Sequence, residues 1–166
     1  GIIFLSVYFI FVFIFLIKFR INSKSVQKAQ EKLLYYSFTD ELTGLYNRRQ
    51  MNEILSTKIK NSEEFVLILG DIDNFKNIND EFGHNAGDYI LKEISLIMKT
   101  SLRDDDFASR WGGEEFLLLI NNTELNDAYK IMERIRKKIE NKAFCSNGEI
   151  IKTTMTYGLS KSSENS

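Results

Sequence analysis

Two pairs of carboxylates are the side chains of this sequence whose types and spacing best suit chemistry. Asp71 and Asp73 follow a strongly apolar run, while Glu114 and Glu115 follow the glycine pair at 112–113 and precede a second apolar run. A tight glycine turn can hold metal-bound phosphates. Carboxylates that face one point need a cation, and hard oxygen ligands with room left for phosphates suit Mg²⁺ or Mn²⁺. The sequence therefore predicts metal-dependent phosphoryl chemistry.

The elements around these carboxylates should bring the two pairs together. The apolar runs at 65–69 and 116–120 lack polar alternation, which predicts strands covered on both faces. Side chains alternate along a strand, so the two aspartates should share one face. Residues 86–99 carry apolar side chains at helical spacing. The order strand, helix, hairpin predicts a split βαβ arrangement, with the third strand antiparallel between the first two, so Asp71 and Glu114 should meet.

Three sequence blocks carry a family resemblance. They read DELTGLYNRR at 40–49, DIDNFKNINDEFGHNAGD at 71–88 and RWGGEEF at 110–116. In this order and spacing they resemble the GGDEF family, the diguanylate cyclases that make cyclic di-GMP from two GTP molecules, over roughly residues 40–159. The resemblance implies an α/β (α+β) domain of ferredoxin-like or polymerase-palm type, with a central, mostly antiparallel sheet flanked by helices.

The resemblance also implies roles for the residues of the metal site. Asp71, the carbonyl of Ile72 and Glu114 would bind Mg²⁺ or Mn²⁺, and Glu115 would bind a second ion. Glu114 would deprotonate the attacking 3′ hydroxyl, while Lys76 would stabilise charge on the phosphates in the transition state. These roles suit phosphoryl transfer, which gains mostly from positioning and from neutralising developing charge.

Guanine recognition is assigned by the same resemblance to Asn79 and Asp88, with His84 nearby. An Asn and an Asp would leave adenine poorly paired, and unpaired buried polar groups enforce rejection, so GTP should be preferred over ATP. Taken alone, this single histidine is more typical of a hydrogen bonder in a loop or at a helix end.

Arg103 and Asp106 match the position at which many family members bind their own product, which implies feedback inhibition by cyclic di-GMP. The alternative is a solvated acidic turn between a helix and a strand. The intervening Asp104 and Asp105 would weaken the attraction of the arginine for a phosphate.

The N-terminal residues 2–17 carry no charge and are followed by Lys18 and Arg20. This pattern predicts a membrane segment over 1–19 that is shorter than the roughly 20 apolar residues of a spanning helix, so we expect its start to be cut off. A signal peptide is the alternative, but the positive charges lie on the wrong side for one. The positive flank predicts an inner (cytoplasmic) membrane location with the catalytic domain in the cytoplasm.

Residues 20–38 predict a signalling coiled-coil helix, with a seam at Val26, Ala29, Leu33 and Tyr36. A connecting helix packed on its own domain is the alternative. A homodimer is favoured because cyclic di-GMP is two-fold symmetric, which matches a C2 pair of half-sites. The catalytic domain is expected over 39–166, without the final helix that the family carries, because KSSENS stands where that helix should begin.

Composition narrows the classes of function. The net charge of −1 gives no basic excess for binding nucleic acid, and one cysteine, Cys145, cannot form an intrachain disulfide, which is typical of a reducing compartment. The leading hypothesis is a membrane-anchored homodimeric diguanylate cyclase. The alternatives are a catalytically impaired module that binds GTP or cyclic di-GMP as a sensor, and a purely structural dimer.

Overall fold

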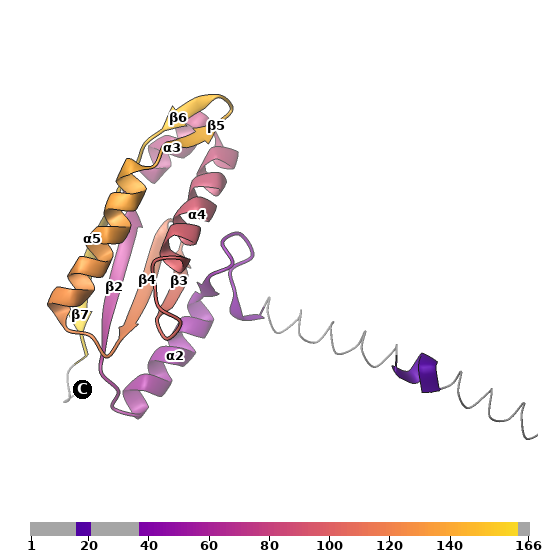
Figure 1. Cartoon of the computed structure of the whole chain (residues 1–166). Helices are drawn as coiled ribbons and strands as arrows, with labels where there is room; N and C mark the ends of the chain where they lie inside the picture. The colour runs from indigo at the N-terminus through magenta and orange to yellow at the C-terminus, as the bar shows by residue number, and fades with distance from the viewer. Residues whose placement is uncertain (1–15, 21–36, 163–166) are drawn as a thin grey trace, which may run out of the picture. The chain divides into compact units, whose positions relative to one another are not determined.

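The computed structural model describes residues 16–20 and 37–162 (Figure 1). The chain forms two compact units, Gly1–Ser37 and Phe38–Ser166, and in the first unit residues 16–20 are helical. The predicted membrane segment over 1–19 and the predicted coiled coil over 20–38 fall largely outside the described residues. Within the described ranges, no helix combines the length and the apolar character that crossing a membrane requires.

The second unit is built on a mixed sheet. The elements are β1 (Tyr46–Asn47), α2 (Arg48–Lys60), β2 (Phe65–Ile72), α3 (Phe75–Phe82), α4 (His84–Lys99), β3 (Phe107–Gly112), β4 (Glu115–Asn121), α5 (Leu125–Asn141), β5 (Phe144–Ser146), β6 (Glu149–Ile151) and β7 (Met155–Lys161). Five strands form one sheet in the order β1-β3-β4-β2-β7, in which only β1 and β3 are parallel, and β5 pairs with β6 in a separate hairpin. The predicted order of strand, helix and hairpin is confirmed, with β4 antiparallel between β2 and β3.

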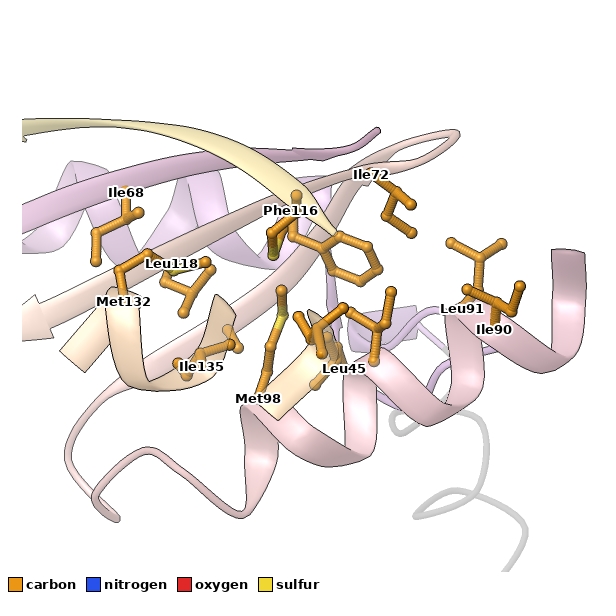
Figure 2. Packing of buried hydrophobic residues seen from close by; sticks show 14 of the residues in the cluster. Leu45, Ile68, Ile72, Ile90, Leu91, Met98, Phe116, Leu118, Met132 and Ile135 are labelled. Atoms are coloured by element: carbon orange, nitrogen blue, oxygen red, sulfur yellow. The ribbon is translucent and has the colours of Figure 1, made fainter. Parts of the chain in front are cut away.

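Two hydrophobic clusters cover the two faces of the sheet. The larger cluster joins the sheet to α4 and α5, and Figure 2 shows Ile68, Phe116 and Leu118 of the strands facing apolar side chains of both helices. The smaller cluster joins Met51 of α2 to the opposite face, at Phe65, Leu117 and Leu119. The core side of α5 consists of Ala128, Met132, Ile135 and Ile139, with Ile131 partly buried.

Burial on both faces is confirmed for β4, whose residues from Phe116 onward are all buried. The same prediction is wrong for the second half of β2, where Leu69 is 45% exposed. The start of β2 is covered because Phe65 packs in the cluster of α2, and this cover does not extend to Leu69. The uncovered stretch leads directly to Asp71, so the fold leaves this part of the sheet open to solvent.

Local signals set the helix boundaries. The side chain of Asn47 accepts a hydrogen bond of 2.9 Å from the backbone N–H of Gln50, which caps the start of α2. α3 and α4 are separated by Gly83, whose φ of 84° favours glycine. As a result α4 begins at His84, slightly before the predicted start at residue 86.

The core assignment of α5 can be tested at Ile135, whose side chain is 0% exposed. We expect Ile135→Ala to lower the free energy of unfolding by about 2–5 kcal/mol, because the lost methyl groups leave a cavity in a packed core. Lys137→Ala, on the exposed face of the same helix, should change it by about 0.5 kcal/mol or less. Urea denaturation of both variants measures the difference, and equal stabilities would contradict the assignment.

Candidate active site

The turn between β3 and β4 forms the first part of the site. Gly112 pairs with Glu115, which leaves Gly113 and Glu114 at the tip, and the strand register shifts between Arg110 and Gly112. Such β-bulges redirect side chains and are common beside active sites. A Cβ at Gly112 would lie only 3.0 Å from Oε2 of Glu115, whereas the space around Gly113 is open. The glycines therefore make room for a carboxylate and leave backbone accessible at the tip.

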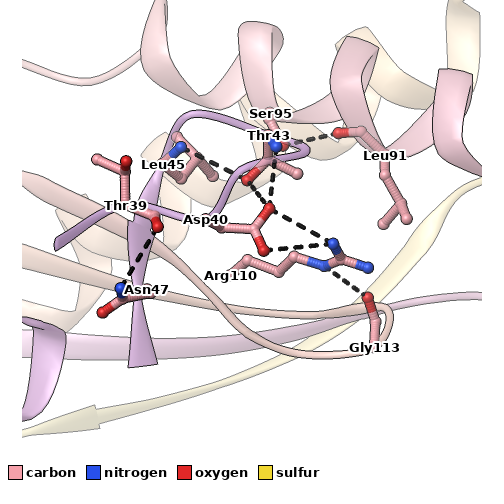
Figure 3. Close-up of polar contacts among 9 residues, drawn as sticks. All are labelled: Thr39, Asp40, Thr43, Leu45, Asn47, Leu91, Ser95, Arg110 and Gly113. Carbon is pink, nitrogen blue, oxygen red and sulfur yellow. Dashed lines mark hydrogen bonds and ion pairs between the residues drawn. The ribbon is translucent and has the colours of Figure 1, made fainter. Parts of the chain in front are cut away.

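Arg110 anchors this turn to the start of the domain (Figure 3). Its Nε donates a hydrogen bond of 2.9 Å to the carbonyl of Gly113, and its Nη1 lies 3.4 Å from both carboxylate oxygens of Asp40. Oδ1 of Asp40 also accepts hydrogen bonds from the N–H and the hydroxyl of Thr43, at 2.9 and 2.7 Å. Sequence reasoning assigned no role to Arg110, and the only signal was its position before the glycine pair.

Asp71, near the end of β2, lies beside this turn. In the antiparallel β2–β4 pairing, Asp71 stands opposite Glu115. The pKa of Asp71 is raised above its usual value, first by burial and then by the negative charges of Glu114, Glu115 and Asp73. Asp71 and Glu114 therefore lie close enough to interact electrostatically, as expected from the strand order. Converging like charges favour protonation or a bound cation.

The backbone carbonyl of Ile72 also faces this region. The N–H of Asp73 donates a hydrogen bond of 3.0 Å to the carbonyl of Thr154, on the β7 side of β2. A trans peptide is planar, so the carbonyl of Ile72, in the same peptide unit, points the opposite way. That direction is the β4 side, where Glu115 begins the strand. The carbonyl oxygen of Ile72 is thus directed toward the edge of β2 that pairs with the hairpin.

The donor set suits a small, hard cation. Among the described residues, no group of three His, Cys, Asp or Glu side chains is arranged to hold a metal ion by itself. The predicted set needs only two carboxylates and a carbonyl for one ion, because Mg²⁺ usually keeps waters and binds substrate phosphates as well. The residues present fit an ion whose coordination is completed by waters and phosphate oxygens.

The residues assigned to guanine lie on two adjoining helices. Asn79 is half-buried on α3, while His84 and Asp88 are exposed one helical turn apart on α4. A Cβ at Gly87 would collide with the side-chain amide of Asn79, and it would lie 3.1 Å from the ring of Phe75. The absence of a side chain at Gly87 therefore lets the amide of Asn79 lie against α4, next to Asp88. The role of Gly87 in making room for Asn79 was not predicted from the sequence.

Lys76 lies in the first turn of α3 and is exposed. It follows the end of β2 by a short turn that contains Asp73 and Asn74. Asn74 adopts a left-handed conformation with φ of 57°, which reverses the chain so that α3 can begin. The lysine and the metal-site carboxylates are therefore connected by only this turn.

Arg103 and Asp106 lie at the other end of the β3–β4 hairpin, about 20 Å from its tip for strands of this length. Asp106 accepts hydrogen bonds from the backbone N–H groups of Asn121, at 3.1 Å, and Arg103, at 3.2 Å. The side-chain amide of Asn121 donates to the carbonyl of Asp105. Asp106 thus has a structural role at the end of β4, and Arg103 is exposed in the turn.

Removing one negative charge should stabilise the metal-free chain. A carboxyl whose pKa is raised stabilises the folded state when protonated, and this contribution is lost as the pH rises through that pKa. We therefore expect Asp71→Asn in EDTA to raise the free energy of unfolding by under about 1 kcal/mol at neutral pH. The gain should vanish at acidic pH, where Asp71 is protonated.

Thermal unfolding of the wild type and of Asp71→Asn, from acidic to neutral pH, measures this change in stability. Asp80→Asn, on an exposed position of α3, is the matched control and should show no such gain. Destabilisation by Asp71→Asn at neutral pH would contradict the charge cluster.

Comparison with known proteins agrees with this geometry. Residues 37–166 match the family described as "Diguanylate cyclase, GGDEF domain". Diguanylate cyclase A of Treponema denticola is 40% identical over 129 residues, which cover 78% of this chain and 33% of that protein. The chain thus spans about a third of the length of this relative.

Solved structures show the same fold. The crystal structure of diguanylate cyclase SiaD in complex with its activator SiaC, from Pseudomonas aeruginosa, is 36% identical with a TM-score of 0.76, over 89% of this chain and 59% of that one. The coiled coil and GGDEF domain of DgcB from Caulobacter crescentus, in complex with c-di-GMP, has a TM-score of 0.82 over 91% of this chain and 83% of that one. At 21% identity the second likeness supports the fold alone. The matched residues, the mixed α+β fold and the 40% identity together show that this chain belongs to the GGDEF domain family of diguanylate cyclases.

Proposed function

We propose that this chain carries the catalytic domain of a diguanylate cyclase, which condenses two GTP molecules into cyclic di-GMP and releases pyrophosphate. The observation that carries the proposal is the β2–β4 register, which places Asp71 opposite Glu115 and in the field of Glu114. Relatives of 40% and 36% identity bear the name diguanylate cyclase, which supports the same activity.

In the proposed site, Asp71, the carbonyl of Ile72 and Glu114 would hold Mg²⁺ or Mn²⁺, and Glu115 would hold a second ion. When bound, such ions neutralise charge on the phosphates. Glu114 accepts the proton of the attacking 3′ hydroxyl. The 3′ oxygen bonds to the α-phosphorus of the second GTP, the bond from that phosphorus to the β-phosphate oxygen breaks, and pyrophosphate leaves. Lys76 stabilises the negative charge that develops on the phosphates.

The reaction needs two copies of the chain, because one site presents one GTP. A second, equivalent condensation closes the ring, so a C2 homodimer that brings two sites face to face matches the symmetry of the product. Dimerisation through the segment 20–38, anchoring in the membrane through 1–19 and a catalytic domain on the cytoplasmic side complete the proposal. These three parts are supported by the apolar and charged patterns of the sequence.

Product inhibition at Arg103 and Asp106 is also part of the proposal. Its support is the RxxD spacing and the exposure of the arginine, which leaves the guanidinium accessible to a phosphate. Because Asp106 already binds the backbone of Asn121, its substitution would also disturb β4. Arg103 is therefore the better residue at which to probe feedback.

Activity can be tested with the 166-residue chain, GTP and Mg²⁺. We expect pyrophosphate and cyclic di-GMP from the wild type, and a kcat lower by about 10²–10⁴-fold in Glu114→Gln, because the general base is lost. Glu149→Gln, in the separate β5–β6 hairpin, should retain full activity. Full activity of Glu114→Gln would exclude it as the base, and GTP binding without any pyrophosphate release by the wild type would favour the binding module.

Guanine preference can be tested at Gly87. The added Cβ of Gly87→Ala should displace the amide of Asn79 and weaken binding of a non-hydrolysable GTP analogue by about 1–3 kcal/mol, since a buried hydrogen bond is lost. Binding of the corresponding ATP analogue should weaken less, so the difference between the two affinities should become smaller. Gly158→Ala fills open space on β7 and serves as the control. Calorimetric titration gives both affinities, and unchanged discrimination would contradict the role of Asn79.

A further inference from the structure

Asp73 is held by three threonines of β7 and the loop before it. Its N–H donates to the carbonyl of Thr154 at 3.0 Å, and its carbonyl accepts from the hydroxyl of Thr153 at 3.0 Å. Its carboxylate oxygen Oδ1 accepts from the hydroxyl of Thr156 at 2.7 Å. The backbone and the side chain of one residue, just after β2, are thus both bound by a segment distant in sequence.

These contacts fix the peptide that presents the carbonyl of Ile72. Rotation of that peptide would break the hydrogen bond of Asp73 to Thr154, and Thr156 restrains the same residue through its side chain. Thr156 also stands opposite Asp71 in the β2–β7 register. Thr156 therefore lies beside Asp71, the proposed carboxylate ligand. It also donates a hydrogen bond to Asp73, the residue that follows the proposed carbonyl ligand.

The threonine segment is itself fixed to α5. Nη1 of Arg136 lies 3.4 Å from the hydroxyl of Thr154. The Nε and Nη2 of the same guanidinium donate hydrogen bonds of 2.8 and 3.2 Å to the two carboxylate oxygens of Glu133. Tyr157 donates a hydrogen bond of 2.6 Å to Glu133. The hydrogen bonds of Arg136 and Tyr157 lower the pKa of Glu133 to about 2, so it stays charged. The segment that binds Asp73 is therefore itself held in place by side chains of α5.

We propose that Thr156 is a positioning residue for the metal site. Its hydroxyl holds the carboxylate of Asp73 and, through it, the peptide that directs the carbonyl of Ile72 toward the hairpin. The hydrogen bond also keeps Asp73 in place beside Asp71, rather than free to reorient toward the ion. Partners that orient metal ligands in this way typically change metal affinity by about 10–100-fold when they are removed. This inference rests on the proposed metal-dependent function.

A structural role alone makes a different prediction. Valine has the shape of threonine without the hydroxyl, and it suits a strand at least as well. If Thr156 only supported the β2–β7 pairing, Thr156→Val would leave the stability and the metal affinity unchanged. If it positions Asp73, the variant stays folded but binds the ion more weakly, and Thr156→Ser restores binding because it keeps the donor.

The test compares the wild type with Thr156→Val, Thr156→Ser and the control Ser160→Ala, which lies on the same face of β7. Free Mn²⁺ is measured by EPR during titration in the presence of a non-hydrolysable GTP analogue. Thermal unfolding in EDTA checks the fold, and the Mg²⁺ concentration for half-maximal pyrophosphate release checks function. We expect the Mn²⁺ dissociation constant and the Mg²⁺ requirement of Thr156→Val to rise by about 10-fold or more, while the serine and control variants stay within about 2-fold.

Wild-type affinity for Mn²⁺ in Thr156→Val would overturn the inference, and so would equal losses in the valine and serine variants. No Mn²⁺ binding by the wild type would overturn both the metal site and the role of Thr156. If the wild type binds Mn²⁺ but releases no pyrophosphate, the proposed cyclase activity fails, and the EPR titration of the variants still decides whether Thr156 positions the site.

Discussion

The pairing of β2 with β4 is the constraint on which the site depends. β4 is apolar on both faces, so side-chain alternation alone does not select its register. The register of β4 with β3 is fixed at both ends, by the short turn at 113–114 and by the hydrogen bond from Asn121 to Asp106. The pairing of β4 with β2 continues beyond the strands, where the N–H of Asn122 donates a hydrogen bond of 3.1 Å to the carbonyl of Glu64. A shift of one residue would remove Asp71 from its place opposite Glu115 and separate the two pairs of carboxylates.

The site concentrates negative charge that the rest of the domain does not neutralise. Among the ion pairs of the described residues, none includes Asp71, Glu114 or Glu115. The contacts that hold the site in place are backbone pairing, threonine hydroxyls and the guanidinium of Arg110 on the carbonyl of Gly113. Unpaired carboxylates that repel one another lower the stability of the fold. They are expected at functional sites, where a bound ligand supplies the compensating positive charge.

Much of this arrangement could be predicted from the sequence, because the strands, the cap at Asn47 and the order of the motifs are local signals. The exposure of Leu69 could not, because it depends on how far the cluster of α2 extends across the sheet. The bond between Arg110 and Asp40 joins residues 70 positions apart, and that between Thr156 and Asp73 joins residues 83 apart. Apolar periodicity carries no information about such polar partners, which are set by tertiary packing.

The late position of β7 in the sequence has a consequence for the order of folding. During synthesis, β2 can pair with β4 once residue 121 has left the ribosome, but Asp73 must wait for Thr156. Contacts of long sequence separation form late because closing the loop costs entropy. One edge of β2 therefore stays unpaired while α5 and the β5–β6 hairpin are made. The nascent domain acquires its hairpin before it acquires the fixed peptide beside it, so the site becomes complete only when the last described strand is in place.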